Sequence, residues 1–193
     1  GQWRLYGEKW FCSCADGDVA MLLARPKGAP EGNNGIALFA MPRTLDNGKR
    51  NKYRIIRLKE KLGSRSMASG EIVFDGAVAY ALGEVGTGKN RGLKMMMDQV
   101  ALSRLSHGAR AAAMMRRALN EAMEVAHNRS AFEEIIINKP LLRRQLMKIM
   151  LPTEQSLSMT MYLGQQITKA EAGDERAEKV TRILTPAHKY RSC

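Results

Sequence analysis

Hydrophobic and polar positions follow two different periods along this 193-residue chain. Before residue 84 the apolar residues form short runs or alternate with polar ones, which predicts β-strands. The runs lie too close together for crossover helices, which favours an antiparallel barrel or sandwich. Gly7 predicts a hairpin turn between residues 3–6 and 9–13. The other predicted strands are residues 19–24, 35–41, 53–56 and 71–74, with a turn at Asp46-Asn47-Gly48.

Beyond Gly92 the apolar period becomes helical. Apolar residues from Ala111 to Val125 recur every three or four positions, which places them on one helix face. We therefore predict an α+β multidomain fold, with an antiparallel β-barrel domain at residues 1–84 and an incomplete up-down helical bundle at residues 85–193. The predicted helix boundaries are a start at Asn138–Pro140, a kink or end at Pro152, a start at Asp174 and an end at Pro186.

The chain is basic, with a net charge of +12. This excess favours an anionic partner, which could be nucleic acid, anionic lipid or a phosphate-rich small molecule. Between Arg43 and Arg65 there are nine Lys/Arg and two Asp/Glu, hence 9 − 2 = +7. Such a run is typical of a solvated edge strand, and it also fits a phosphate-facing surface.

No apolar run approaches the roughly 20 residues of a membrane span. Three cysteines are too few for a disulfide framework, so we expect a reducing, cytoplasmic location. Cys12 and Cys14 lack two further ligands at suitable spacing, so we interpret them as a packed pair on one face of a strand. His107, His127 and His188 form no two-histidine motif, and each is expected to be a cap or a surface residue. No metal site is therefore expected.

A glycine-rich stretch, Gly83 to Asn90, is one residue short of a phosphate-binding P-loop. Asn90 stands where a Ser or Thr hydroxyl should hold magnesium, and Ala77 to Leu82 is a poor β-run ahead of it. We interpret the stretch as a connection between sheet and helices. From the residues alone, the chain shows no self-contained catalytic constellation.

Several stretches together resemble one family, the flavin-dependent acyl-CoA dehydrogenases. WRLYGEKWFCS at residues 3–13 resembles the first strand pair after the flavin loop, and residues 58–74 resemble the "K-x-G-x-R-x-S … F" segment. Further matches occur in the same order along the chain. They are residues 82–88, 103–105 and 126–132. Three more stretches resemble the bacterial branch that includes the alkylation-response flavoproteins. These are Arg50-Asn51, 114–117 and 184–190.

The resemblance implies a middle β-barrel domain followed by part of a four-helix bundle. It also implies that this chain is a fragment: a helical domain and a flavin loop should precede Gly1, and the general-base glutamate should lie beyond Cys193. The implied reaction is α,β-dehydrogenation of an acyl-CoA thioester with hydride transfer to FAD. We expect the fragment alone to be inactive, and no catalytic residue is assigned within it.

By the same resemblance, Phe11, Cys12 and Ser13 lie along the isoalloxazine ring. Arg129 and Phe132 match an "R-x-x-F-G" turn that reaches a neighbouring subunit's FAD, although Glu133 stands where the family has Gly. The implied substrate-binding residue is Arg104, which matches an arginine near the acyl-CoA channel.

The implied partners are acyl-CoA, an electron-transfer acceptor, and further copies in a homodimer or homotetramer. The alternative is a DNA-associated alkylation-response flavoprotein, or a basic nucleic-acid-binding module with little dehydrogenase activity.

Overall fold

The computed structural model describes residues 1–85 and 91–193. They form two compact units, Gly1–Met97 and Asp98–Cys193. Most of the P-loop-like stretch, residues 86–90, lies outside the described residues.

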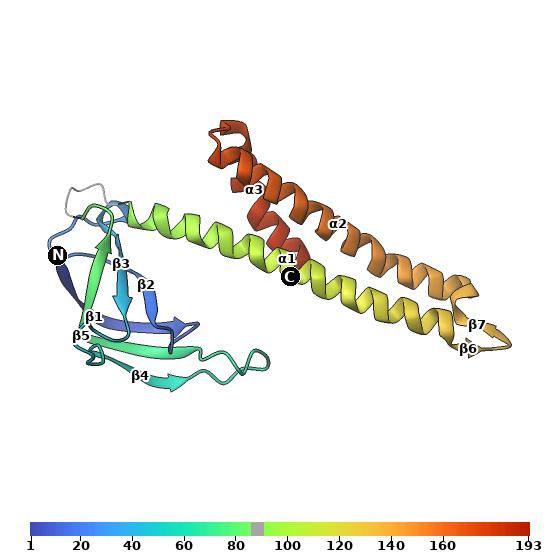
Figure 1. Ribbon diagram of the computed structural model, residues 1–193, viewed down its shortest axis with the longest axis horizontal. Coiled ribbons are helices and arrows are strands. Elements are labelled where there is room, and N and C mark those ends of the chain that lie inside the picture. The colour runs from blue at the N-terminus through green and yellow to red at the C-terminus, as the bar shows by residue number, and fades with distance from the viewer. Residues whose placement is uncertain (86–90) are drawn as a thin grey trace. The chain divides into compact units, whose positions relative to one another are not determined.

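The first unit is a curled antiparallel sheet (Figure 1). Its strand order is β1-β5-β3-β2, and β4 also pairs with β5. Because β5 has 13 residues, its two ends hydrogen-bond to different neighbours, β4 at its start and β3 at its end. In the part of this unit that the structure describes, the strands are β1 Gln2–Cys12, β2 Val19–Ala24, β3 Ala37–Pro42, β4 Tyr53–Leu58 and β5 Gly70–Leu82.

The core of this unit lies on one side of the sheet, where alternate apolar residues of several strands meet. Trp3 packs edge-on against the buried Phe39, with ring centroids 5.6 Å apart. Asn51 is a polar member of the interior: its amide nitrogen donates to the carbonyls of Pro42 and Val78 at 2.7 and 2.8 Å. Its side-chain oxygen accepts from the Val78 N–H at 2.8 Å, so Asn51 fastens the loop before β4 to β5.

The predicted hairpin at Gly7 is wrong, because Gln2–Cys12 is one continuous strand. Gly7 has φ +128°, a conformation open to glycine, and a register shift between Leu5 and Tyr6 lets β1 continue along β5. The interpretation of Ala77 to Leu82 as a poor β-run is also wrong, since these residues form the second half of β5. The other strand predictions and the turn are confirmed, with the Gly48 N–H donating to the Leu45 carbonyl at 2.8 Å.

Three long helices follow within the described residues, which confirms the α+β fold class. A short hairpin of β6, Ser130–Ala131, and β7, Glu134–Ile135, joins the first two helices, together with the 3₁₀ turn η2, Ile136–Asn138. In the described part of the chain, no helix is long and apolar enough to cross a membrane. The helices are α1 Gly92–Asn128, α2 Pro140–Glu171 and α3 Glu175–Ser192.

Asp174 caps α3 as predicted, accepting from the N–H groups of Arg176 and Ala177 at 2.9 and 3.0 Å. Asn138 is not a cap: Lys139 holds that position, with Pro140 at the first helical turn.

The two prolines end neither helix. Pro152 lies inside α2 and Pro186 inside α3. Each is adjacent to a fully buried threonine, Thr153 and Thr185, so packing of the neighbouring turn offsets the hydrogen bond that proline cannot donate.

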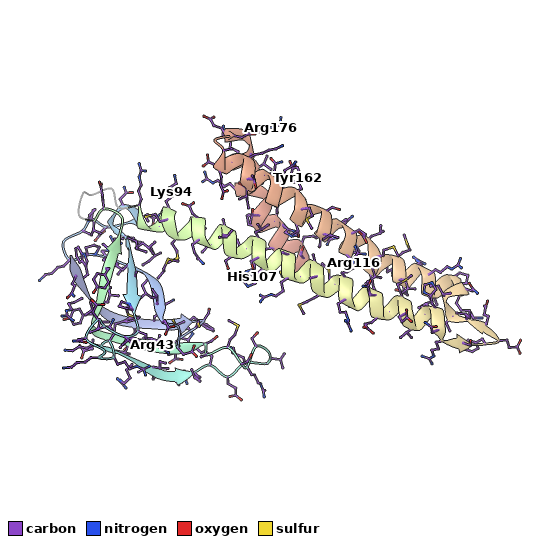
Figure 2. The ribbon with its side chains drawn as sticks, in the orientation of Figure 1. Arg43, Lys94, His107, Arg116, Tyr162 and Arg176 are labelled. Carbon is purple, nitrogen blue, oxygen red and sulfur yellow. The ribbon has the colours of Figure 1, made fainter. Side chains whose placement is uncertain are left out.

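Within the second unit, α2 packs along α3. An ion pair of 2.6 Å joins Arg116 on α1 to Glu154 on α2, and Figure 2 labels this arginine on its helix.

Candidate functional site

The residues expected along the flavin lie together at the end of β1. Phe11 is 54% exposed, and Cys12 is the last residue of the strand, paired with Gly70. Ser13 is exposed in the turn that follows, and its carbonyl accepts from the Ser69 hydroxyl at 3.5 Å. The strand end therefore presents an aromatic ring and a hydroxyl to solvent.

Trp10 is a further exposed aromatic residue at the end of β1, and the sequence analysis did not assign it to the site. Its indole is 64% exposed, and the ammonium of Lys59 lies 3.3 Å from the ring centroid. Its signal in the sequence was an aromatic pair, Trp10-Phe11, directly beside the assigned residues. The contact with Lys59 had no local signal, since 49 positions separate the two residues.

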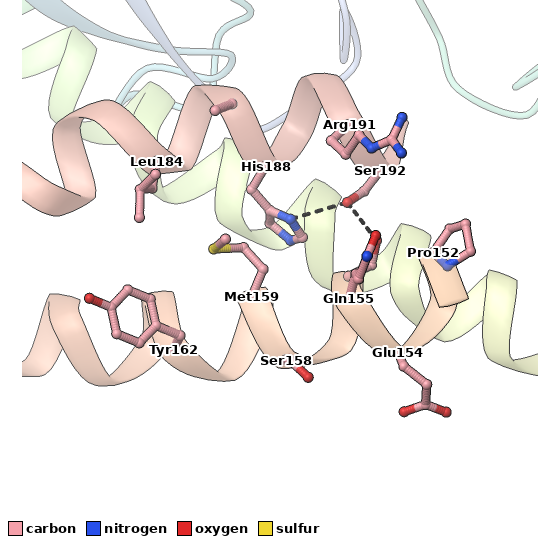
Figure 3. Close-up of a pocket in the computed structure, with 12 residues that line it drawn as sticks. Pro152, Glu154, Gln155, Ser158, Met159, Tyr162, Leu184, His188, Arg191 and Ser192 are labelled. Carbon is pink, nitrogen blue, oxygen red and sulfur yellow. Dashed lines mark hydrogen bonds between the residues drawn. The ribbon is translucent and has the colours of Figure 1, made fainter. Parts of the chain in front are cut away.

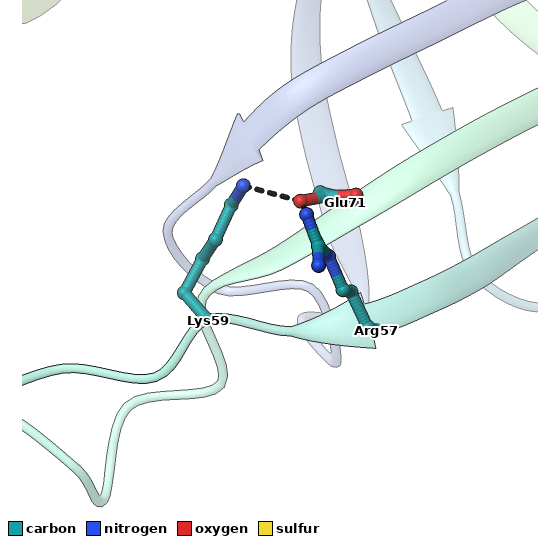
Figure 4. A network of polar contacts seen from close by, with 3 residues as sticks. All are labelled: Arg57, Lys59 and Glu71. Atoms are coloured by element: carbon teal, nitrogen blue, oxygen red, sulfur yellow. Dashed lines mark hydrogen bonds and ion pairs between the residues drawn. The ribbon is translucent and has the colours of Figure 1, made fainter.

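Glu71 on β5 holds two cations, Lys59 and Arg57 (Figure 4). Both cations also lie near the Trp10 ring. Glu71 Oε1 lies 2.5 Å from Lys59 Nζ and 2.8 Å from Arg57 Nε. The Lys59 ammonium, followed by Arg57, lowers the pKa of the Glu71 carboxyl below its ordinary value, against the opposing effect of burial. The carboxylate is therefore ionised at neutral pH and anchors both cations.

Contacts within the first unit engage five of the nine cations of the basic run from Arg43 to Arg65. Arg43 pairs with Asp18 at 2.5 Å and donates to the Asp16 carbonyl at 2.8 Å. Lys61 donates to the Met67 carbonyl at 2.8 Å, and Arg65 to the Lys61 carbonyl at 3.0 Å. Together with the pairs at Glu71, these contacts favour the interpretation of an edge strand and its loop over a phosphate-facing surface.

The two nearby cysteines are not a packed pair. Cys12 packs partly against the core of the sheet, whereas Cys14 is exposed beyond the strand end. A hydrogen bond to Asp16, at 3.5 Å, raises the pKa of the Cys14 thiol. Among residues 1–85 and 91–193, no three His, Cys, Asp or Glu side chains are grouped so that they could hold a metal ion.

Arg129 directly precedes the β6–β7 hairpin in the second unit, and Phe132 lies in its turn. Arg129 is exposed, and its carbonyl accepts from the Ile136 N–H at 3.0 Å, which closes the base of the hairpin. Phe132 and Glu133 have φ of +53° and +66°, the two left-handed residues of a tight hairpin turn. Lys139 supports the turn: its ammonium lies 5.6 Å from the Phe132 ring centroid and 2.6 Å from Glu134.

Arg104 is half-buried on α1. It precedes Arg129 by 25 positions, and a helix rises 1.5 Å per residue, so about 37 Å of helix separates the two arginines. One copy of the chain therefore does not bring Arg104 together with Arg129 and Phe132. Phe11, Cys12 and Ser13 belong to the other unit and form a group of their own.

A cavity of about 650 Å³ lies between α2 and α3 (Figure 3). Met159, Leu184 and Ala187 give it apolar walls, and His188 and Ser192 lie at its polar end. His188 was expected to be a cap or a surface residue, yet it is only 4% exposed. The polar partner on its own helix is Ser192, four residues further along α3, and this pair gave no signal of burial in the sequence.

Hydrogen bonds around His188 form a closed ring between α2 and α3. Thr160 donates to the Ser156 carbonyl at 2.8 Å, so its hydroxyl oxygen accepts from His188 Nε2 at 3.0 Å. Ser192 then donates to His188 Nδ1 at 3.1 Å, and Ser156 Oγ lies 2.9 Å from Ser192 Oγ. Nε2 therefore carries a proton, and burial lowers the pKa of His188, which favours the neutral imidazole with Nδ1 as the acceptor.

The end of β1 is chemically suited to a flat aromatic ligand. Two exposed rings offer apolar faces, Ser13 offers a hydroxyl group, and the neighbouring ammonium of Lys59 favours an electron-rich or anionic partner. These features fit the isoalloxazine ring of a flavin, with Trp10, Phe11, Cys12 and Ser13 as the residues that would hold it.

Comparison of the sequence with known proteins finds one family. The family profile described as "Acyl-CoA dehydrogenase, C-terminal domain" matches residues 90–191. The chain is 35% identical over 197 residues to AidB of Escherichia coli (strain K12), covering 100% of this chain and 34% of AidB. It is 30% identical over 193 residues to acyl-CoA dehydrogenase family member 11 of Caenorhabditis elegans, covering 97% of this chain and 31% of that protein.

A solved structure of a protein from the same family is also similar to this chain. The crystal structure of Caenorhabditis elegans ACDH-11 in complex with C11-CoA superposes with a TM-score of 0.86 at 29% identity, covering 98% of this chain and 32% of that one. The chain therefore belongs to the acyl-CoA dehydrogenase family. It spans about a third of the length of these relatives.

Proposed function

We propose that the protein is an FAD-dependent acyl-CoA dehydrogenase, which converts an acyl-CoA thioester to its α,β-unsaturated product. The observation that carries the proposal is the group of exposed residues at the end of β1 in a chain of this family. In this reaction the bound flavin supplies the hydride acceptor. We further propose residues 1–84 as the β domain and residues 85–193 as part of the helical domain.

In this proposal the residues of β1 bind and orient the cofactor. Trp10 and Phe11 pack against the flat ring system and exclude water from one side of it. The Ser13 hydroxyl hydrogen-bonds to a polar edge of the ring, and Cys12 fixes the strand end through its pairing with Gly70.

Arg129 and Phe132 bind a nucleotide cofactor from a second copy of the chain in a homodimer or homotetramer. The guanidinium of Arg129 can donate two parallel hydrogen bonds to a pyrophosphate. Arg104 contributes to acyl-CoA binding from α1. None of the assigned residues is a catalytic base, and the electron acceptor is a separate redox partner.

The test is to purify the full-length protein, saturate it with FAD, and add acyl-CoA thioesters of increasing chain length without oxygen. We expect bound flavin to lose its visible absorption with at least one thioester, and a dye acceptor to restore it. A protein that binds FAD but keeps its absorption with every thioester would refute the dehydrogenase function. A protein that binds no FAD would refute the cofactor assignment as well.

No specific observation favours the nucleic-acid alternative, and five cations of the basic run already contact other groups of the same unit.

A further inference from the structure

The two aromatic residues at the end of β1 lie in a β-bulge. Lys9 pairs with Ile72 and Cys12 pairs with Gly70, so Trp10 and Phe11 together face the single residue Glu71. In a regular strand, successive side chains point to opposite faces. Here the ammonium of Lys59 lies 3.3 Å from the Trp10 ring centroid and 4.9 Å from that of Phe11. The bulge therefore brings both rings around the same cation.

A bulge also interrupts the ladder that would otherwise fix these residues. Some other contact must set the orientation of the two rings, and Lys59 is placed to do so. Its side chain is 10% exposed, far less than the rings it touches. Its N–H donates to the Ser69 carbonyl at 2.7 Å, and its ammonium is held by Glu71 at 2.5 Å. Both ends of the lysine are thus anchored to the start of β5.

Lys59 belongs to a group of charged side chains beside the two rings. Arg57 shares the same carboxylate oxygen of Glu71 and lies 5.6 Å from the Trp10 ring centroid. Two cations and one carboxylate leave a net positive charge beside the rings. A cation over an indole ring is an attractive contact, and it is stronger when the cation is shielded from water.

We propose that Lys59 is a positioning residue, which holds Trp10 and Phe11 as one aromatic platform for the flavin ring and places a positive charge beside it. This inference rests on the proposed function. Its consequence is electrostatic as well as geometric, because a nearby positive charge stabilises a flavin that has gained electrons. Lys59 therefore raises both the affinity for FAD and the reduction potential of the bound cofactor.

The experiment compares variants of the full-length protein by FAD titration and by the reduction potential of the bound flavin. Lys59→Met keeps the length of the side chain and removes the charge, whereas Lys59→Arg keeps the charge. Lys49→Met is the matched control, since it removes a charge from an exposed loop of the same unit. Thermal unfolding of each apoprotein reports any loss of folding.

We expect Lys59→Met to weaken FAD binding by about three- to tenfold, the range of a cation–π contact. Its bound flavin should have a more negative reduction potential and a shifted visible spectrum. Lys59→Arg and Lys49→Met should stay close to wild type. If Lys59→Met fails to fold, Glu71→Gln, which removes the anchor and keeps the lysine, should weaken FAD binding in the same direction.

Lys59→Met or Glu71→Gln with the affinity and potential of Lys49→Met would overturn the inference and leave the proposed function standing. A wild-type protein that binds no FAD would instead refute the proposed function, and the inference with it.

Discussion

His188 shows how strongly the surroundings of one residue decide its chemistry. The sequence offered three histidines with no distinguishing motif, yet this one is buried between two helices. Its imidazole contacts hydroxyl groups rather than carboxylates, and burial lowers its pKa, which favours the neutral form. No local pattern could reveal this, because two of the partners, Ser156 and Thr160, lie on another helix.

This burial predicts a loss of stability in mild acid. In the unfolded chain a histidine binds a proton near pH 6.5, whereas burial lowers the pKa of His188 in the folded protein. The unfolded state therefore binds more protons as the pH falls below about 6.5, and the free energy of unfolding decreases until the pH passes the folded pKa. Urea unfolding at pH 7.5 and 5.5 measures the effect.

The matched control for this prediction is the exposed His127. His188→Gln should be less stable than wild type at pH 7.5 but should lose less stability on acidification, whereas His127→Gln should follow wild type. An equal loss in wild type and His188→Gln would show that another group titrates.

At the scale of single elements, the sequence predicted whether a segment is a helix or a strand better than it predicted where the segment ends. The strands at residues 19–24 and 53–56 and the Asp174 cap are confirmed, because their patterns are local. The hairpin at Gly7 was wrong because pairing with β5, which is distant in sequence, keeps β1 continuous. The helix end predicted at Pro186, and the end given as one alternative at Pro152, were wrong because tertiary packing outweighs the missing hydrogen bonds.

Two glycines inside helices should respond in opposite ways to alanine. At Gly108 on α1 a Cβ atom would lie 2.4 Å from the His188 ring, so Gly108→Ala should destabilise the protein by about 1–3 kcal/mol. At Gly164 on α2 nothing lies within 4 Å of a Cβ, so Gly164→Ala should stabilise it by about 0.5–1 kcal/mol through helix propensity. Urea denaturation of both variants measures the difference. Equal effects would show that packing at Gly108 is looser than described.

The β6–β7 hairpin carries a strain that glycine can relieve. Glu133 has φ +66°, a left-handed conformation that costs about 1–2 kcal/mol for most L-residues. We expect Glu133→Gly to protect the hairpin amides from hydrogen exchange, while Glu133→Ala, which removes the carboxylate but keeps the Cβ atom, should not. If both variants gave the same protection, charge rather than backbone conformation would be responsible.

At the scale of the whole molecule, the order of sheet and helices was predictable from periodicity alone, and the family from motifs in the same order. The assigned residues stay predictions, since they lie in two units and one copy does not unite Arg104 with Arg129. What the sequence could not reveal is the grouping of Trp10 with Lys59, because it depends on a bulge opposite Glu71.

The account depends on the end of β1 being a flavin platform. The most direct test is a crystal structure of the full-length protein with FAD. We predict that the isoalloxazine ring packs against Trp10 and Phe11, with the Ser13 hydroxyl within hydrogen-bond distance of its polar edge and Lys59 beneath the two rings. A flavin bound elsewhere, with these rings still exposed to solvent, would contradict the account.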